Sequence, residues 1–230
     1  MEKTADYAEL ASFTGKLLRD NFGKGPSSVY VSIEHPFITI YLQDFLAPME
    51  KVLARQNREI KIEETRDMLM EELIPEFKGQ IRGMLNVGIS NVYYDWDMQN
   101  QSGFIIGIID EECVDDTPLP FPYYKEKERI HDHIIKVCEI AQKGPEHIDS
   151  YFLNDRTLVI ERHGIMVEIE KEMISTGFSD QLRLAKRKLE KRLLDPKLVE
   201  SLLNVHVQDK FVVWDFKRDT SYITFILKPK

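Results

Sequence analysis

Cysteine and long apolar runs are both scarce in this sequence of 230 residues. Only two cysteines occur, Cys113 and Cys138, and their separation fits neither a disulfide framework nor a metal-binding motif, so both are expected to be reduced thiols. The longest apolar stretch, residues 104–109, is 6 residues long, whereas a membrane-spanning helix needs about 20. The first residues lack the apolar core of a signal peptide. We therefore expect a cytoplasmic globular protein.

Excess positive charge and catalytic signatures are also missing. The net charge of −8 argues against a general nucleic-acid binder, whose surface would be basic overall, so no nucleic-acid partner is expected. No Gly-x-Ser-x-Gly elbow or Walker-type phosphate loop occurs. Gly23 and Gly25 follow a predicted helix rather than the strand that precedes a phosphate-binding turn. The sequence therefore predicts that the protein is not an enzyme and holds no cofactor.

The sequence does contain an internal repeat. Its only two tryptophans, Trp96 and Trp214, are 118 residues apart, and each is followed by aspartate and then, after a polar turn, by an apolar strand. Other stretches return at offsets of 119 and 120 residues: 24–26 at 143–145, 38–40 at 158–160, and 49–51 at 169–171. A nearly constant offset of half the chain length indicates a duplicated domain. The repeats are predicted to span residues 1–112 and 125–230.

An acidic and proline-rich stretch, residues 113–124, separates the two predicted repeats. Its prolines at every second position favour an extended conformation. Such a segment could be a ligand for a peptide-binding domain. Its length and position are typical of a linker, which is the interpretation we favour.

Within each repeat, the pattern of apolar residues predicts the order α-β-β-α-α-β-β. In the first repeat, a helix over residues 7–21 has an apolar face at helical spacing, and alternating apolar residues predict a hairpin over residues 29–42. Helices are expected at 46–56 and 62–73, and Pro75 is expected to restart the helix at its first turn. Two hairpins separated by helices favour the α+β class, with an antiparallel sheet covered by helices on one face.

Both repeats resemble the MpsC-like domain family. In the first repeat the resemblance rests on a Gly-Lys-Gly-Pro stretch, an apolar strand, the turn after it and the end of a helix: residues 23–26, 38–42, 46–50 and 73–77. The second repeat departs at Gln142, which replaces the first glycine, and at Asp195-Pro196, where the proline is shifted by one position. The family is associated with a bacterial system linked to sodium translocation, membrane potential and inorganic-carbon uptake. The resemblance therefore implies an accessory or regulatory role.

The two Trp-Asp pairs are the first candidate binding site. Trp96-Asp97 and Trp214-Asp215 could present aromatic faces to a ligand. We favour cross-strand packing of the two rings, with each aspartate forming a turn. Both tryptophans are then expected to occupy equivalent, buried places on their hairpins.

Five of the six histidines lie in the second repeat, which raises metal binding and pH sensing as candidate functions. His131 and His133 are two residues apart, so on a helix their side chains point to different sides. We expect the histidines to be scattered and solvent-exposed, and we expect no metal site. Cys138 lies in a predicted amphipathic helix, where a buried structural thiol is expected.

The repeats differ most in the charge of one predicted helix. Residues 63–72 carry five acidic residues and one basic residue, whereas the matching residues 183–192 carry six basic residues and one acidic residue. Because both helices also carry apolar residues, we expect the charges on the outer face, with Lys186, Lys188 and Lys191 as the basic binding residues. The acidic and the basic face would meet partners of opposite sign, either each other across a dimer or a cationic and an anionic surface. Reversing these lysines to glutamate is expected to slow association without unfolding the protein. A solvated face without a partner is the alternative.

The sequence therefore predicts a non-catalytic regulatory or accessory binding protein that serves a membrane-associated cation or inorganic-carbon transport system. Its expected partners are another protein, at the periphery of a membrane complex, or a second copy in a homodimer. The alternative is a cytosolic small-ligand sensor with a pocket between the two repeats, a common location for ligands in two-domain proteins.

Overall fold

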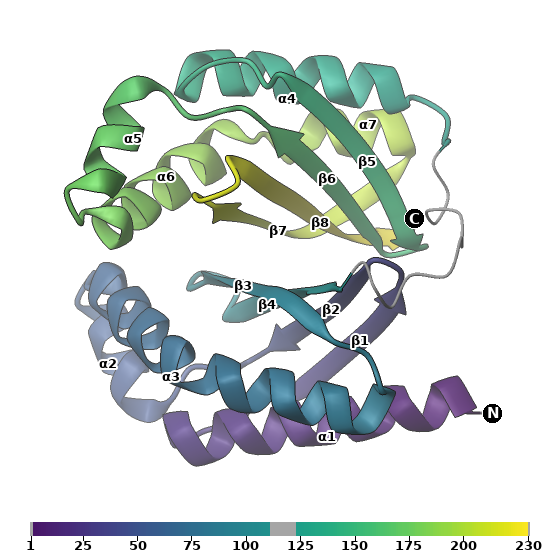
Figure 1. The fold of residues 1–230 in the computed structure, drawn as a ribbon, viewed down its shortest axis with the longest axis vertical. Helices are drawn as coiled ribbons and strands as arrows, with labels where there is room; N and C mark the ends of the chain where they lie inside the picture. Colours follow the sequence, from purple (N-terminus) through teal and green to yellow (C-terminus); the bar gives the residue numbers. More distant parts are fainter. Residues whose placement is uncertain (1, 111–122, 230) are drawn as a thin grey trace. The chain divides into compact units, whose positions relative to one another are not determined.

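The computed structural model describes residues 2–110 and 123–229, and the chain separates into two compact units, Met1–Pro118 and Leu119–Lys230 (Figure 1). Residues 113–122 of the predicted linker, including Cys113, lie outside the described residues. Among the described residues, no helix has both the length and the apolar character needed to cross a membrane.

The first unit contains three helices and one antiparallel sheet among its described residues. In chain order the elements are α1 (Glu2–Phe22), β1 (Ser28–Glu34), β2 (Phe37–Gln43), α2 (Pro48–Arg55), α3 (Glu59–Leu85), β3 (Ile89–Asp97) and β4 (Ser102–Ile109). The strand order is β1-β2-β4-β3, so the two hairpins meet through their second strands.

The second unit repeats this arrangement. Its elements are α4 (Lys127–Ala141), β5 (His147–Asn154), β6 (Thr157–His163), α5 (Glu168–Ser175), α6 (Ser179–Leu193), α7 (Pro196–Leu203), β7 (Val205–Asp215) and β8 (Thr220–Pro229). The strand order β5-β6-β8-β7 and the antiparallel pairing match those of the first unit. The prediction that both halves share one fold is therefore confirmed.

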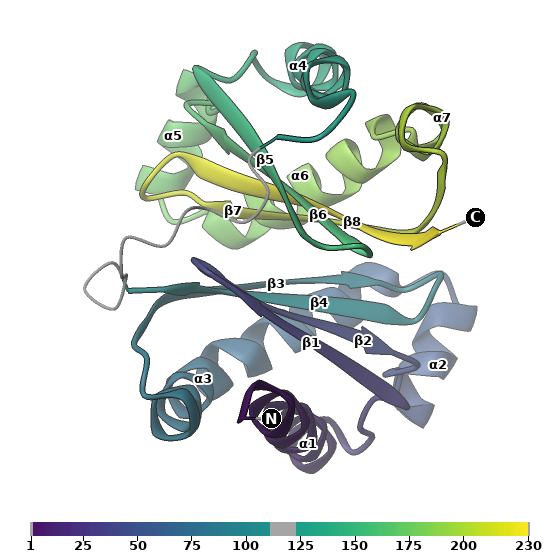
Figure 2. The same ribbon diagram turned by 90° about the vertical axis from the view of Figure 1, so that its right-hand side faces the viewer.

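Helices cover one face of each sheet, as Figure 2 shows for α1 and α3 in the first unit and for α4, α6 and α7 in the second. The core lies between these layers because alternate strand residues point to the same side. In the first unit, Ile38 and Ile40 of β2 are buried with Leu10 of α1 and Phe77 and Ile81 of α3. In the second unit the core is built in the same way: Leu158 and Ile160 of β6 are buried with Ile130 and Ile134 of α4.

The long central helix differs between the units. The prediction that Pro75 restarts a helix is wrong, because α3 continues through Pro75 as one helix of 27 residues. A proline inside a helix loses one backbone hydrogen bond, but Leu73 and Phe77 on either side of it are buried in the core and hold the helix together. In the second unit the helix breaks instead, because Asp195 caps α7 by accepting a 3.0 Å hydrogen bond from the backbone nitrogen of Lys197.

Candidate functional site

The two tryptophans lie at equivalent places under the closing hairpins and are buried, as predicted. Trp96 is 1% exposed and Trp214 is 5% exposed. Each indole nitrogen donates a hydrogen bond to a carboxylate of the long helix: Trp96 to Asp67 at 3.2 Å and Trp214 to Glu190 at 3.1 Å. Rings buried in this way cannot serve as an exposed ligand platform.

The aspartates that follow the tryptophans form turns. Asp97 Oδ1 accepts a 2.9 Å hydrogen bond from the backbone nitrogen of Asn100. Asp215 Oδ1 accepts hydrogen bonds from the backbone nitrogens of Lys217 and Arg218, at 3.0 and 3.1 Å. Both carboxylates therefore satisfy backbone donors of the hairpin turn, which accounts for the repeated Trp-Asp pattern without a ligand.

Both units contain an equivalent, largely buried ion pair between a short helix and the long helix that follows it. In the first unit Glu50 lies 2.7 Å from Arg66, and in the second Glu170 lies 2.7 Å from Lys186. Glu170 follows Glu50 by 120 residues, and Lys186 follows Arg66 by the same distance. Each glutamate also accepts a backbone hydrogen bond at the start of its helix, from Ala47 at 2.7 Å and from Val167 at 3.1 Å. The pair therefore anchors the short helix to the long one in each unit.

The cation of this pair is held differently in the two units. The Arg66 guanidinium lies over three aromatic rings, 4.4 Å from the centre of Phe22, 4.0 Å from Phe45 and 4.8 Å from Trp96. Burial lowers the pKa of Arg66, and the hydrogen bond to Glu50 opposes that shift; an arginine stays protonated at neutral pH in any case. The first unit thus encloses one cation in an aromatic cage.

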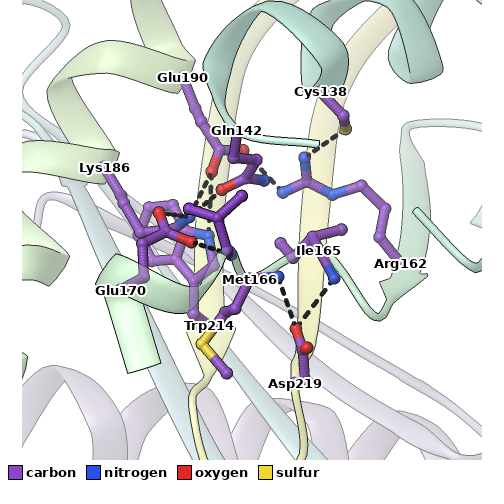
Figure 3. Close-up of polar contacts among 11 residues, drawn as sticks. Cys138, Gln142, Arg162, Ile165, Met166, Glu170, Lys186, Glu190, Trp214 and Asp219 are labelled. Carbon is purple, nitrogen blue, oxygen red and sulfur yellow. Dashed lines mark hydrogen bonds and ion pairs between the residues drawn. The ribbon is translucent and has the colours of Figure 1, made fainter. Parts of the chain in front are cut away.

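Lys186 corrects the expectation that the charges of this helix lie on its outer face. Its side chain is only 4% exposed, and its Nζ lies 2.7 Å from Glu170 Oε1 and 3.7 Å from Glu190 Oε1 (Figure 3). Nζ also contacts the Gln142 side chain. The expectation failed because two carboxylates, one of them from another helix, point at the inner face of α6. Lys188 is exposed as expected, whereas Lys191 is half-buried with its Nζ 5.5 Å from the centre of the Phe211 ring.

A second buried ion pair in the second unit has no counterpart at the matching positions of the first unit. Arg162 of β6 donates to Glu190 Oε2 at 2.7 Å and to Cys138 Sγ at 3.1 Å (Figure 3). All three side chains are buried. At the positions 120 residues earlier the first unit has three buried apolar side chains: Leu18, Leu42 and Met70. The second unit therefore has a polar network where the first unit has part of its apolar core.

The charges in this network determine its protonation. Burial by itself lowers the pKa of Arg162, but the charge of Glu190 and the interactions with Cys138 together outweigh it and raise the pKa overall. Burial raises the pKa of the Cys138 thiol, although the nearby Arg162 opposes that shift. Cys138 is therefore a neutral, buried thiol at neutral pH, as the sequence predicted, and Arg162 and Glu190 form a charged pair.

Asp219, which the sequence did not single out, supports this region from the β7–β8 turn. Its Oδ1 accepts hydrogen bonds from the backbone nitrogens of Ile165 and Met166, at 2.9 and 3.0 Å (Figure 3). These contacts fix the segment that leads from β6 to α5, and hence the position of Glu170. Asp219 has a left-handed φ of 47°, which aspartate tolerates better than most residues.

The expectation that the histidines are solvent-exposed holds for His147 and His206 and is wrong for His131. It is buried, and its Nε2 lies 2.7 Å from Ser150 Oγ, which is itself 2.8 Å from the Tyr124 hydroxyl. The position near the start of α4 faces β5 rather than solvent, so the side chain needs a polar partner. Burial lowers the pKa of His131 and of His133. In residues 2–110 and 123–229, no group of His, Cys, Asp and Glu side chains is arranged to hold a metal ion.

Comparison with known proteins identifies a family for this chain but no individual relative. No curated protein and no solved structure is significantly similar to the chain. The family described as "Na+-translocating membrane potential-generating system (MpsC)" matches residues 3–111 and again residues 127–229. These two segments contain the seven elements of the first unit and the eight of the second. The chain therefore belongs to the MpsC family and carries the family's domain twice.

Proposed function

We propose that the chain is a non-catalytic, cytoplasmic accessory component of a membrane-associated cation transport system and that it acts by binding a protein partner. The observation that carries this proposal is the family match over both units. The description of the family names a Na+-translocating system that generates a membrane potential. The buried network supports this proposal as well. Glu170 and Glu190 are already paired with Lys186 and Arg162, so a partner would be bound by exposed side chains rather than by these carboxylates.

The exposed side of α6 is the surface that we assign to the partner. Lys188 and Arg192 are exposed one turn apart, and Gln181 and Ala185 extend the same face toward the start of the helix. Between Gln181 and Arg192 this face has no large exposed apolar side chain, so it suits an acidic protein surface that is recognised by charge. Charge complementarity of this kind mainly raises the association rate and is weakened by salt.

The charge of the two units supports the assignment. Residues 1–118 contain 11 basic and 21 acidic residues, a net charge of −10, whereas residues 119–230 contain 20 basic and 18 acidic residues, a net charge of +2. The second unit is therefore the part of the chain that an acidic partner would approach with least repulsion.

Co-purification from the native host tests this proposal. The tagged chain is recovered from detergent-solubilised membranes at low and high salt, and retained proteins are identified. We expect subunits of a cation transport system to be retained at low salt, and Lys188→Glu/Arg192→Glu to lose them. The control is Lys136→Glu/Lys217→Glu, which makes the same charge change at exposed positions outside α6. Equal retention by both variants, or retention of no transport subunit by the wild type, would contradict the proposal.

A further inference from the structure

We infer that the corner formed by α2 and the start of α3, residues 48–61, binds the surface of an anionic lipid bilayer. This inference does not depend on the protein partner proposed above. The corner exposes three apolar side chains within 12 residues: Met49 is 77% exposed, Val52 is 50% exposed and Ile60 is 49% exposed. Large apolar side chains exposed together in a short segment typically mark an interaction site.

The contacts of α2 explain why these side chains point outward. Leu53 and Ala54 pack against the core of the first unit, and Met49 and Val52, three residues apart, lie on another face of the helix. Glu50, the acidic residue in the first turn, points inward to Arg66 and to the backbone of Ala47. The fold therefore removes the negative charge of α2 from its exposed surface.

The charged side chains of the corner are mostly basic, and its only acidic residue besides Glu50 is the half-buried Glu59. Arg55, Arg58 and Lys61 are exposed next to the apolar residues, while Lys51 is 3.5 Å from Asp44 and is partly neutralised. This local positive charge stands against the net charge of −10 of the first unit. Exposed apolar residues among basic ones are the composition of segments that lie in the interface of an anionic membrane. The α6 face formed by Gln181, Ala185, Lys188 and Arg192, by contrast, has no large exposed apolar side chain.

The matching corner of the second unit provides an internal comparison. It also exposes apolar side chains, Ile169 at 67% and Phe178 at 53%. The positions 120 residues after Arg55, Arg58 and Lys61 are, however, uncharged: Ser175, Phe178 and Gln181. The position that matches Val52 is Glu172. Residues 48–61 carry four basic and two acidic residues, whereas the matching residues 168–181 carry one basic and four acidic residues. Both corners therefore expose apolar side chains, but only the corner of the first unit has the basic charge that suits an anionic bilayer.

Vesicle flotation with the purified full-length chain tests the inference. The vesicles are either an equimolar mixture of phosphatidylglycerol and phosphatidylcholine, or phosphatidylcholine alone. We expect the wild type to float with the anionic vesicles and not with the neutral ones, and to be released by high salt. Arg55→Glu/Arg58→Glu is expected to lower the apparent affinity by at least about tenfold. Met49→Ser/Val52→Ser is expected to lower it as well, because apolar side chains add their burial in the interface.

The control variant is Ile169→Ser/Phe178→Ser, which removes the exposed apolar residues of the second unit and is expected to bind like the wild type. All of these positions are exposed, and an unchanged melting temperature confirms that each variant is folded. Three outcomes would overturn the inference. The first is a wild type that does not float with anionic vesicles, and the second is equal loss in the control. The third is loss of vesicle binding in Arg55→Glu/Arg58→Glu but not in Met49→Ser/Val52→Ser. That result would instead indicate a surface for an acidic protein.

Discussion

Each tryptophan ring packs into the core of its unit, and its indole nitrogen donates a hydrogen bond to a carboxylate. Trp96 packs against Phe22 and Phe45, with ring centres 6.4 and 5.1 Å away. Gly103, its cross-strand partner, leaves the necessary room, because a Cβ there would lie 2.7 Å from the ring. At the residue scale, substitutions at these sites and at the buried ion pairs should therefore be among the most destabilising.

Truncating either tryptophan tests this packing. Trp96→Ala and Trp214→Ala are each expected to lower the free energy of unfolding by about 3–5 kcal/mol, because they leave a cavity. Trp→Phe at the same positions should cost less, since it removes mainly the hydrogen bond to Asp67 or Glu190. Urea denaturation of the purified variants measures both. A cost below about 1 kcal/mol for the alanine variants would mean that the rings do not support the core.

Lys186 gives a sharper contrast, because its neighbour in sequence, Lys188, is exposed. Lys186→Glu is expected to cost about 3–5 kcal/mol, since it places a third carboxylate beside Glu170 and Glu190 in a buried site. Lys188→Glu should change stability by no more than about 0.5 kcal/mol. Similar unfolding midpoints for the two variants would show that Lys186 is not buried as described.

Protonation of His131 should make the second unit less stable in mild acid. Burial lowers the pKa of His131 in the folded state, so the unfolded state, with a pKa of about 6.5, takes up the proton first. The neutral form therefore stabilises the fold above that pH, and this contribution is lost as the pH falls from about 7 to 5. His131→Gln should weaken the pH dependence of unfolding, whereas His147→Gln, at an exposed position, should leave it unchanged. An identical pH profile in wild type and His131→Gln would contradict the assignment.

At the element scale, the ion pair between Arg162 and Glu190 joins β6 to α6. The first unit has apolar residues at the matching positions, so it provides a comparison for this pair. Arg162→Leu alone should cost about 3–5 kcal/mol, because it leaves Glu190 buried with one of its partners removed. The triple variant Cys138→Leu/Arg162→Leu/Glu190→Met, which installs the residues of the first unit, should be less destabilised than the single variant. Chemical denaturation compares the two. A triple variant less stable than Arg162→Leu would show that the polar network is more than a substitute for apolar packing.

Much of the element order could be predicted from the sequence, whereas the buried charges could not. Hairpins, helix faces and the tryptophan sites follow from apolar periodicity and from the repeat, and both depend on local residues. Lys186, Arg162 and Glu190 look like surface residues in a linear pattern, because only the fold brings their partners from other elements. The continuous helix through Pro75 depends likewise on tertiary packing of Leu73 and Phe77. Comparing the repeats position by position could have shown that Glu50 and Arg66 return as Glu170 and Lys186.

At the scale of the whole molecule, duplication has produced two units with one fold and different surfaces. The first is acidic apart from the α2–α3 corner, and the second is close to neutral, with a basic stripe on α6. The ion pair between the short and the long helix occurs in both units, whereas the exposed residues differ between them. The proposed accessory role depends on this difference in surface charge, because we assign partner binding to the exposed face of α6. We assign the two buried networks to stability.

The most direct test of this account is the sodium-dependent membrane potential of native host cells that lack the chain. We predict that the potential falls on deletion and that the wild type restores it. Lys136→Glu/Lys217→Glu should restore it as well, whereas Lys188→Glu/Arg192→Glu should fail to do so while remaining folded and present at normal levels. An unchanged potential in the deletion strain, or full restoration by the α6 variant, would contradict the account.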